Sequence, residues 1–235
     1  MNVPATNLPI VVLPGMDGTG KLFEPFVARL SRSRRVEVIA YPVDQPLDYA
    51  GLSDFVLRRV PHEPYLIAGE SFGGPLAIEI AARDAHVAGL ALVSTFARHP
   101  LPPWLEPPSR LINTGRLPRA LIEGMLLGNE PALAVRERLA RILPTITPET
   151  MRARTTAVLR VDKRDRLKAL RCPILCITAT KDLLLGARGL KDIHGTRADC
   201  TVELIDGPHM LLETRPEQVA GVIEGWCRRR VAAPG

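Results

Sequence analysis

The chain has 235 residues and a formal net charge of +6, with 46% hydrophobic and 24% charged residues. This balance is typical of a globular protein, and the length suits one large domain or a core with a small insertion. The positive charge does not by itself indicate nucleic-acid binding, because the sequence lacks zinc-finger spacings, RNA-binding signatures and basic–aromatic alternation.

Short apolar runs alternate with amphipathic segments in most of the chain. The runs predict strands at 8–14, 36–42, 65–71, 87–96, 173–179 and 200–206. The amphipathic segments predict helices near 21–32, 49–60, 73–85, 187–194 and 216–230. Several runs, such as 66–68 and 174–177, are continuously apolar, as in parallel strands that helices cover on both faces. The sequence therefore predicts a doubly wound, mostly parallel α/β sheet of about six strands.

The alternation stops between residues 97 and 170. A proline-rich stretch opens this segment, and the pattern then predicts helices near 104–113, 118–127, 131–143 and 148–169. We therefore expect residues 1–96 and 171–235 to form the core, and residues 97–170 to be a helical insertion.

Two places in the insertion are typical of helix starts, with a capping side chain followed by proline in the first turn. One is Thr147 followed by Pro148. The other is Asn129 or Glu130 followed by Pro131.

A G-x-S-x-G motif runs from Gly69 to Gly73, between a predicted strand and a predicted helix. In this context the serine occupies a strained turn that presents its hydroxyl above the sheet edge, and the glycines leave room for the turn. The N-terminus of the next helix favours negative charge nearby. We predict that Ser71 is a nucleophile; the alternative is a glycine-rich turn with an incidental serine.

A serine nucleophile needs a base. His209 directly follows the last predicted strand, so we expect it at the same edge of the sheet as the serine. His99, at the start of the insertion, is the reserve candidate. The remaining histidines are expected at the surface; they are His62, His86 and His194.

The base in turn needs an orienting carboxylate. Asp182 follows the predicted strand 173–179. In enzymes that carry a G-x-S-x-G motif between a strand and a helix, the nucleophile, acid and base follow one another along the chain in the order Ser, Asp, His, which is the order of Ser71, Asp182 and His209 here. Asp206, three residues before His209, is the competing candidate, as a second carboxylate or a turn-forming residue. We favour Asp182 because of its position after the strand.

The loop after the first predicted strand is rich in glycine. It predicts an oxyanion hole formed by the backbone N–H groups of Met16 and Phe72, with Gly15 allowing close approach of the substrate. The same loop fits the G-x-x-x-x-G-K pattern of a phosphate-binding loop as far as Lys21, but Leu22 stands where a magnesium-binding hydroxyl is needed. We therefore expect neither a nucleotide nor a metal.

These motifs together resemble the α/β-hydrolase family over nearly the whole chain, from residue 13 to residue 219. The resemblance implies a cofactor-independent carboxylic-ester hydrolase that acts on short or medium acyl chains, with a Ser71–His209–Asp182 triad and an acyl-enzyme intermediate. Thioesterase or acyltransferase chemistry fits the same triad. A non-catalytic ligand-binding member of the fold is the alternative of another class.

Two features depart from the family pattern. Only about seven residues precede the first predicted strand, so we expect a shortened sheet. The loop reads Pro14-Gly15 where the family often has His-Gly. Neither departure affects the candidate triad.

The resemblance also implies that the insertion is a cap over the site. Trp104 and Leu126, like the Phe72 side chain, are candidates to line the acyl pocket, and a place in the apolar core is the alternative. Residues 97–170 hold 14 Lys/Arg and 7 Asp/Glu, and thus the whole positive excess of the chain. The most prominent arginines are Arg136, Arg138, Arg141, Arg152 and Arg154. The insertion looks like the four-helix cap of small bacterial esterases that cleave the methyl ester of pimeloyl-carrier protein. An acidic acyl-carrier protein is therefore a candidate partner, and solvated helix faces are the alternative.

The cysteines and the N-terminus indicate a cellular compartment. Cys172 immediately precedes the predicted strand 173–179 and Cys176 lies within it. In an extended chain they would be about 13 Å apart, at ~3.3 Å per residue, which is too far for a disulfide. The N-terminus lacks a basic segment followed by a long apolar run, and no stretch is long enough to span a membrane. We expect a soluble, cytoplasmic protein with reduced thiols.

Overall fold

Six parallel strands form one sheet in the order β2-β1-β3-β4-β5-β6. The computed structural model describes residues 8–100 and 119–231. The strands are β1 (Ile10–Leu13), β2 (Val36–Val38), β3 (Tyr65–Glu70), β4 (Val87–Val93), β5 (Ile174–Ala179) and β6 (Thr201–Ile205). The predicted fold class, an α/β-hydrolase sheet of about six mostly parallel strands, is confirmed.

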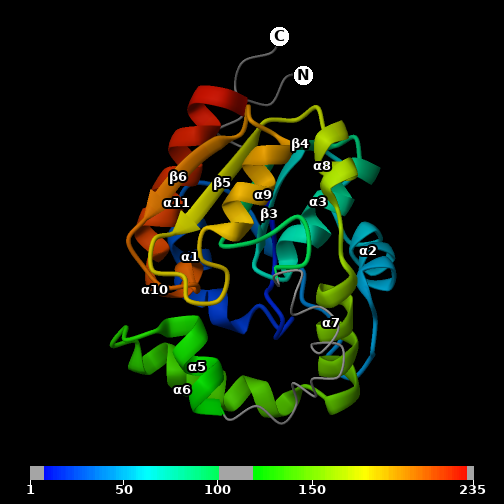
Figure 1. Ribbon diagram of the computed structural model, residues 1–235. Helices are drawn as coiled ribbons and strands as arrows, with labels where there is room; N and C mark the ends of the chain where they lie inside the picture. The colour runs from blue at the N-terminus through cyan, green and yellow to red at the C-terminus, as the bar shows by residue number, and fades with distance from the viewer. Residues whose placement is uncertain (1–7, 101–118, 232–235) are drawn as a thin grey trace.

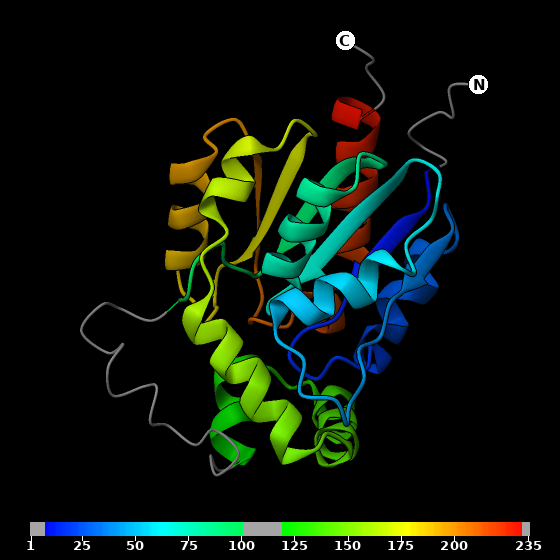
Figure 2. The ribbon, with the colours of Figure 1, turned by 90° about the vertical axis from the view of Figure 1, so that its right-hand side faces the viewer.

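Helices cover both faces of the sheet (Figures 1 and 2). One layer contains α1 (Glu24–Leu30) and α11 (Pro216–Trp226), and the other contains α2 (Tyr49–Leu57), α3 (Gly73–Arg83) and α9 (Arg188–Thr196). Short helical turns complete these layers; they are η2 (Lys21–Phe23), α10 (Leu211–Thr214) and η6 (Cys227–Val231). All six residues of β3 are buried, because this central strand contributes alternate side chains to the two apolar layers.

The segment between β4 and β5 is mostly helical from residue 119 to residue 169. It contains α5 (Arg119–Leu127), α6 (Leu133–Ile142), η5 (Leu143–Thr145), α7 (Pro148–Arg160) and α8 (Arg164–Ala169). Helices α5, α6 and α7 lie beyond the carboxyl ends of the strands (Figure 1). The helix expected near 104–113 falls outside the described residues.

The predicted helix 148–169 is two helices, α7 and α8, because the chain pairs with an earlier segment between them. Arg98 and Asp162 form an antiparallel bridge. On either side, the His99 amide donates to the Val161 carbonyl at 2.9 Å, and the Lys163 amide donates to the Ala97 carbonyl at 2.7 Å. These bonds end α7 and direct α8 back onto α3 and α9, where Leu167 is fully buried.

One of the two predicted helix starts is correct. The Thr147 hydroxyl accepts a hydrogen bond from the Thr150 amide at 3.3 Å, and Pro148 opens α7. The other is wrong, because α6 begins at Leu133 without a side-chain cap. The Glu130 carboxylate instead pairs with Arg215, at 2.9 Å. No helix in the described ranges is long and apolar enough to cross a bilayer.

Replacing Gly69 by alanine is expected to lower the free energy of unfolding by about 3 kcal/mol, because the added methyl group overpacks the motif turn. A Cβ atom there would lie 2.3 Å from the Gly73 carbonyl oxygen and 2.8 Å from the Gly74 amide nitrogen, and backbone cannot move aside cheaply. The measurement is urea unfolding of both proteins.

Gly221→Ala is the matched control. Gly221 lies inside α11, and a Cβ atom there meets nothing within 4 Å. This variant is expected to gain about 0.5–1 kcal/mol from helix propensity and lower unfolded-state entropy. Equal midpoints for the wild type and Gly69→Ala would contradict the packing argument.

Candidate active site

Three side chains from three strand ends form one hydrogen-bonded chain. Ser71 follows β3, Asp182 follows β5 and His209 follows β6. The His209 Nε2 atom lies 2.8 Å from Ser71 Oγ, and its Nδ1 atom lies 2.7 Å from Asp182 Oδ2. His209 is 1% exposed and Asp182 is 7% exposed, so the interaction between them is buried, whereas Ser71 is partly exposed. The structure thus brings together the three predicted residues.

Ser71 has a strained backbone, with φ of +52°, in the left-handed region that non-glycine residues rarely adopt. Three hydrogen bonds hold it there. The Ser71 amide donates to the Val93 carbonyl at 3.1 Å, and the Ser71 carbonyl accepts from Thr95 Oγ1 and from the Gly74 amide. The turn into α3 therefore fixes the direction of Oγ toward His209.

Asp182 is held as a carboxylate by the loop in which it lies. Its Oδ1 atom accepts hydrogen bonds from the amides of Leu184 and Leu185, at 2.9 and 2.8 Å. Burial works to raise the pKa of Asp182, but the hydrogen bonds from His209 and from these amides outweigh it and lower the pKa below its ordinary value of 3.8. A charged Asp182 requires the His209 proton to be on Nδ1, which leaves Nε2 free to accept the serine proton.

The competing candidates lie elsewhere. Asp206 is exposed and pairs with Lys181 Nζ at 2.8 Å, and it also accepts from the Thr180 hydroxyl. His99 lies where residues 97–99 pair with residues 161–163, and its backbone amide donates to the Val161 carbonyl. Neither side chain contacts Ser71 in the described residues.

The loop after β1 lies directly beside Ser71. A Cβ atom on Gly15 would lie 3.9 Å from the Ser71 Cβ atom, and one on Gly73 would lie 2.4 Å from the Leu13 carbonyl oxygen. Within the described part of the chain, neither the Met16 amide nor the Phe72 amide has a hydrogen-bond partner. Neither of the two predicted oxyanion donors is thus bound to a protein acceptor among the described residues.

The rest of this loop does not suit a phosphate. The Asp17 carboxylate accepts from the Thr19 amide and hydroxyl, at 2.8 and 2.6 Å, so an anionic side chain occupies the turn. The described residues contain no group of His, Cys, Asp and Glu side chains suited to a metal ion.

The predicted substrate-contacting residues have different positions. Trp104 lies outside the described residues. Leu126 is partly buried, and its carbonyl accepts from the Met210 amide at 3.4 Å, which places the end of α5 against the turn that holds His209. The Phe72 side chain is core, because its ring stacks on Tyr49 with centroids 4.7 Å apart.

A pair of buried carboxyl groups lies behind the triad, and the sequence reasoning missed it. Glu70 precedes Ser71, and Glu213 follows His209 by four residues. Each carboxyl group lies close enough to shift the pKa of the other, and Glu70 accepts a hydrogen bond from the Leu212 amide at 3.1 Å. Burial, with the second carboxyl nearby, raises the pKa of Glu70 well above its ordinary value. The only signal in the sequence was the closeness of each glutamate to a predicted catalytic residue.

This pair makes stability depend on pH. Burial raises the pKa of Glu213 to about 8, with Asp17 adding to the shift and Arg138 opposing it. The folded protein therefore keeps a proton that the unfolded chain loses above its ordinary pKa of 4.5. Because the native state then binds more protons, the free energy of unfolding falls as pH rises between these two values.

We expect wild-type stability to fall by on the order of 3 kcal/mol between pH 5.5 and 8.5, and Glu213→Gln to reduce this dependence, with the part due to the raised pKa of Glu70 remaining. Urea unfolding at the two pH values measures both. Glu137→Gln, on the exposed side of α6, is the control and should keep the wild-type dependence. A wild-type stability that rises over this pH range would contradict the assignment.

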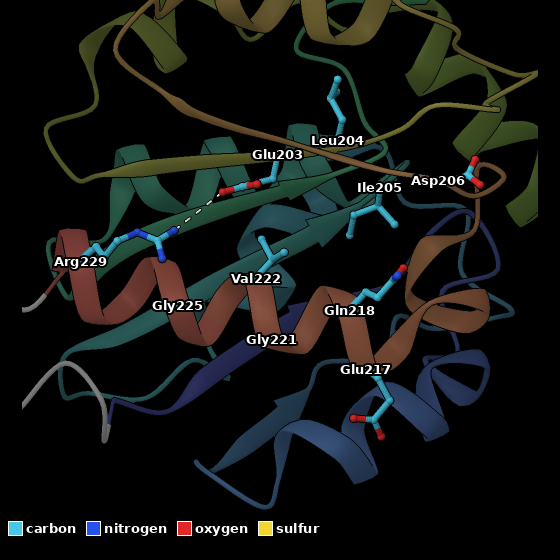
Figure 3. Close-up of a pocket in the computed structure, with 10 residues that line it drawn as sticks. All are labelled: Glu203, Leu204, Ile205, Asp206, Glu217, Gln218, Gly221, Val222, Gly225 and Arg229. Carbon is cyan, nitrogen blue, oxygen red and sulfur yellow. Dashed lines mark ion pairs between the residues drawn. The ribbon is translucent and has the colours of Figure 1, made fainter.

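A groove of 480 Å³ lies between the edge strand β6 and helix α11 (Figure 3). It is lined by residues 203–206 and by Glu217, Gln218, Gly221, Val222, Gly225 and Arg229. Glu203 and Arg229 form an ion pair across it, at 3.8 Å. None of the triad residues lines this groove.

Solved structures with the same architecture include an enol-lactonase from Burkholderia xenovorans LB400, with a TM-score of 0.81 and 19% identity over 94% of this chain and 91% of that one. An esterase from Exiguobacterium antarcticum gives a TM-score of 0.82 and 15% identity over 96% and 93% of the two chains. A thermophilic esterase from Thermogutta terrifontis gives 0.74 and 23%, over 97% and 92%. At these identities the likeness concerns the fold.

A sequence relative is phytyl ester synthase 1, chloroplastic, from Arabidopsis thaliana, which is 27% identical over 264 residues. The alignment covers 94% of this chain and 37% of that protein, so the chain spans little more than a third of its relative. The model of the alpha/beta hydrolase family matches residues 10–222, which include the whole sheet and all three triad positions. This chain belongs to the alpha/beta hydrolase family.

Proposed function

We propose that this protein is a serine esterase that hydrolyses carboxylic esters through an acyl-enzyme. The observation that carries the proposal is the continuous hydrogen-bonded chain from Ser71 Oγ through His209 to Asp182. Membership of a hydrolase family and the likeness to solved esterases support it.

In the first step, His209 Nε2 accepts the Ser71 proton while Oγ attacks the ester carbonyl carbon. Asp182 stabilises the resulting imidazolium from the other side of the ring. The negative charge moves to the former carbonyl oxygen, which the N–H groups of Met16 and Phe72 stabilise. His209 then gives the proton to the departing alkoxide, and the alcohol leaves.

In the second step, His209 removes a proton from water, and the hydroxide attacks the acyl group on Ser71. The second tetrahedral intermediate collapses, and the serine oxygen takes the proton back from His209. The acid is released and the free enzyme is restored without a cofactor.

A second activity, acyl transfer to an alcohol, uses the same acyl-enzyme. The relative named phytyl ester synthase favours it, because an ester synthase must deliver an acyl group to a hydroxyl group. The outcome depends on whether water or alcohol reaches the acyl-enzyme first. Thioesters are further candidate donors for Ser71, since their carbonyl is attacked in the same way.

The helices between β4 and β5 form the cap of the proposed site, within the predicted 97–170 insertion. A carrier protein docked on cap arginines is a narrower proposal, and the structure reduces its basis. Arg136 pairs with Glu123, and Arg154 is buried. Two of the five prominent arginines, Arg136 and Arg154, therefore do not belong to an exposed basic surface.

The test is hydrolysis of p-nitrophenyl esters in a chain-length series, combined with labelling by a fluorophosphonate. We expect turnover with an optimum at short or medium chains, and one covalent adduct on the peptide that contains Ser71. Added long-chain alcohol that diverts acyl product into a new ester would identify the transferase activity. No turnover and no adduct would refute the proposal.

A further inference from the structure

Arg154 connects the inserted helices to the loop beside Ser71. It lies on α7 and is 1% exposed. Its Nη1 atom donates to the carbonyl oxygens of Met16 and Asp17, at 2.7 and 2.8 Å, and its Nη2 atom donates to the carbonyl oxygen of Pro42 at 2.8 Å. Carbonyl groups of two separate loops thus converge on one guanidinium.

The loops leave a space that fits this guanidinium. Gly18 has φ of +72°, and a Cβ atom there would lie only 2.6 Å from Arg154 Nη1. The Gly18 carbonyl accepts from the Tyr41 amide at 2.7 Å, and the Tyr41 ring centroid lies 5.6 Å from Arg154 Cζ. A side chain at position 18 would displace the arginine, so the glycine and the arginine depend on each other.

The burial of this charge is energetically costly. Among the described residues, no carboxylate lies within ion-pair distance of Arg154, and its Nε atom is buried without a partner. Burial lowers the pKa of Arg154, with Tyr41 and Asp17 opposing the shift. A guanidinium stays charged in proteins, and a buried charge without a counterion is destabilising. An apolar side chain would serve packing alone better, which points to a role beyond packing.

The hydrogen bonds of Arg154 restrain the two peptides that follow the one carrying the Met16 N–H, because they hold the Met16 and Asp17 carbonyls. The Gly18 amide in turn donates to the Gly15 carbonyl at 3.1 Å. With bonds on both sides of Met16, the Gly15–Met16 peptide cannot rotate freely, so its N–H keeps one direction.

We propose that Arg154 is a positioning residue of the oxyanion hole, which aims the Met16 N–H at the carbonyl oxygen attacked by Ser71. The inference rests on the proposed esterase function. It assigns to α7, an inserted helix, a part in the rate of acyl transfer as well as in covering the site.

The test compares Arg154→Met with Arg152→Met in steady-state hydrolysis of p-nitrophenyl butyrate. Arg152 lies on the same helix but is exposed and pairs with Glu149 at 2.9 Å. We expect kcat of Arg154→Met to fall about 100-fold, as when an oxyanion donor is lost, with KM changed less than about threefold. Arg152→Met should stay within about twofold of the wild type in both constants.

A transition-state analogue separates positioning from general loss of structure. The affinity for a trifluoromethyl ketone, which binds as a tetrahedral adduct of the nucleophile, should fall in Arg154→Met by the same factor as kcat. A folded Arg154→Met protein with wild-type kcat would overturn the inference. So would a loss confined to KM, because that is the effect of a residue that only binds substrate.

A second variant covers the case in which Arg154→Met does not fold. Arg154→Lys keeps the charge but loses the planar set of donors, so kcat should fall about tenfold with circular dichroism unchanged. Wild-type kcat in folded Arg154→Lys would overturn the inference. Failure of the esterase proposal is distinguishable, because wild-type protein would then show neither turnover nor a fluorophosphonate adduct on Ser71.

Discussion

Ser71→Ala is expected to lower kcat for p-nitrophenyl ester hydrolysis by about 10⁵-fold or more, close to the background rate. The variant keeps the oxyanion loop and the His209–Asp182 pair but lacks the atom that forms the acyl-enzyme. We expect KM to change little, because the hydrogen bond that the variant loses is the one between the Ser71 hydroxyl and His209, within the free protein. Stopped-flow assays should show that the initial burst of p-nitrophenol disappears.

Ser94→Ala is the matched control for this variant. Ser94 also follows a buried strand, has φ of +40°, and has a buried hydroxyl without a hydrogen-bond partner in the described chain. Removing that hydroxyl should leave kcat within about twofold and the free energy of unfolding unchanged or slightly higher. If Ser71→Ala kept wild-type turnover while Ser94→Ala lost it, the nucleophile would be assigned to the wrong strand.

Asp182→Asn is expected to lower kcat by about 10⁴-fold while the protein remains folded. The amides of Leu184 and Leu185 both point at Oδ1, so the asparagine must place its carbonyl oxygen there. Its NH₂ group then faces His209 Nδ1 and donates to it. This forces the ring proton onto Nε2, which faces Ser71 and can no longer accept the serine proton.

The control is Asp206→Asn, which removes the competing carboxylate. Asp206 is exposed and its ion pair with Lys181 is a surface pair, so kcat should change by less than about twofold. Proton NMR of the two variants adds a direct readout, because only Asp182→Asn should change the tautomer of His209. Full activity in Asp182→Asn would show that His209 is oriented by another group.

Sequence patterns predicted the sheet and the meeting of Ser71, Asp182 and His209 at one edge of it, because both depend on local features. A strand followed by G-x-S-x-G, and a histidine just after the last strand, are visible within a few residues of sequence. The parallel sheet then brings the strand ends to one edge, so sequence order alone was enough to suggest Asp182. The break after Arg160 was not predictable in this way, because it depends on pairing with residues 97–99, about 60 positions earlier.

The features that were missed depend on distant contacts. Arg154 was interpreted as part of a basic surface, since charge and helical position are all that a sequence displays. Its partners are backbone carbonyls more than 110 positions away in the sequence. Because every residue has a backbone carbonyl, the sequence cannot indicate which ones the arginine will bind. Glu70 and Glu213 are also more than 110 positions apart in the sequence, and they meet because the fold brings the end of β3 next to α10. Likewise Glu130 was taken for a helix cap, but Arg215 binds it from the other end of the chain.

The pairing at Arg98 and Asp162 has an evolutionary consequence. The segment between β4 and β5 leaves and re-enters the core at neighbouring points that are joined by backbone hydrogen bonds. Such an insertion can be exchanged or lengthened without moving either strand, so substrate preference can diverge while the nucleophile, base and acid stay in place. In a chimera that carries another family member's insertion between residues 100 and 161, we expect activity to require that the new insertion place a guanidinium against the loop at Met16, as Arg154 does here.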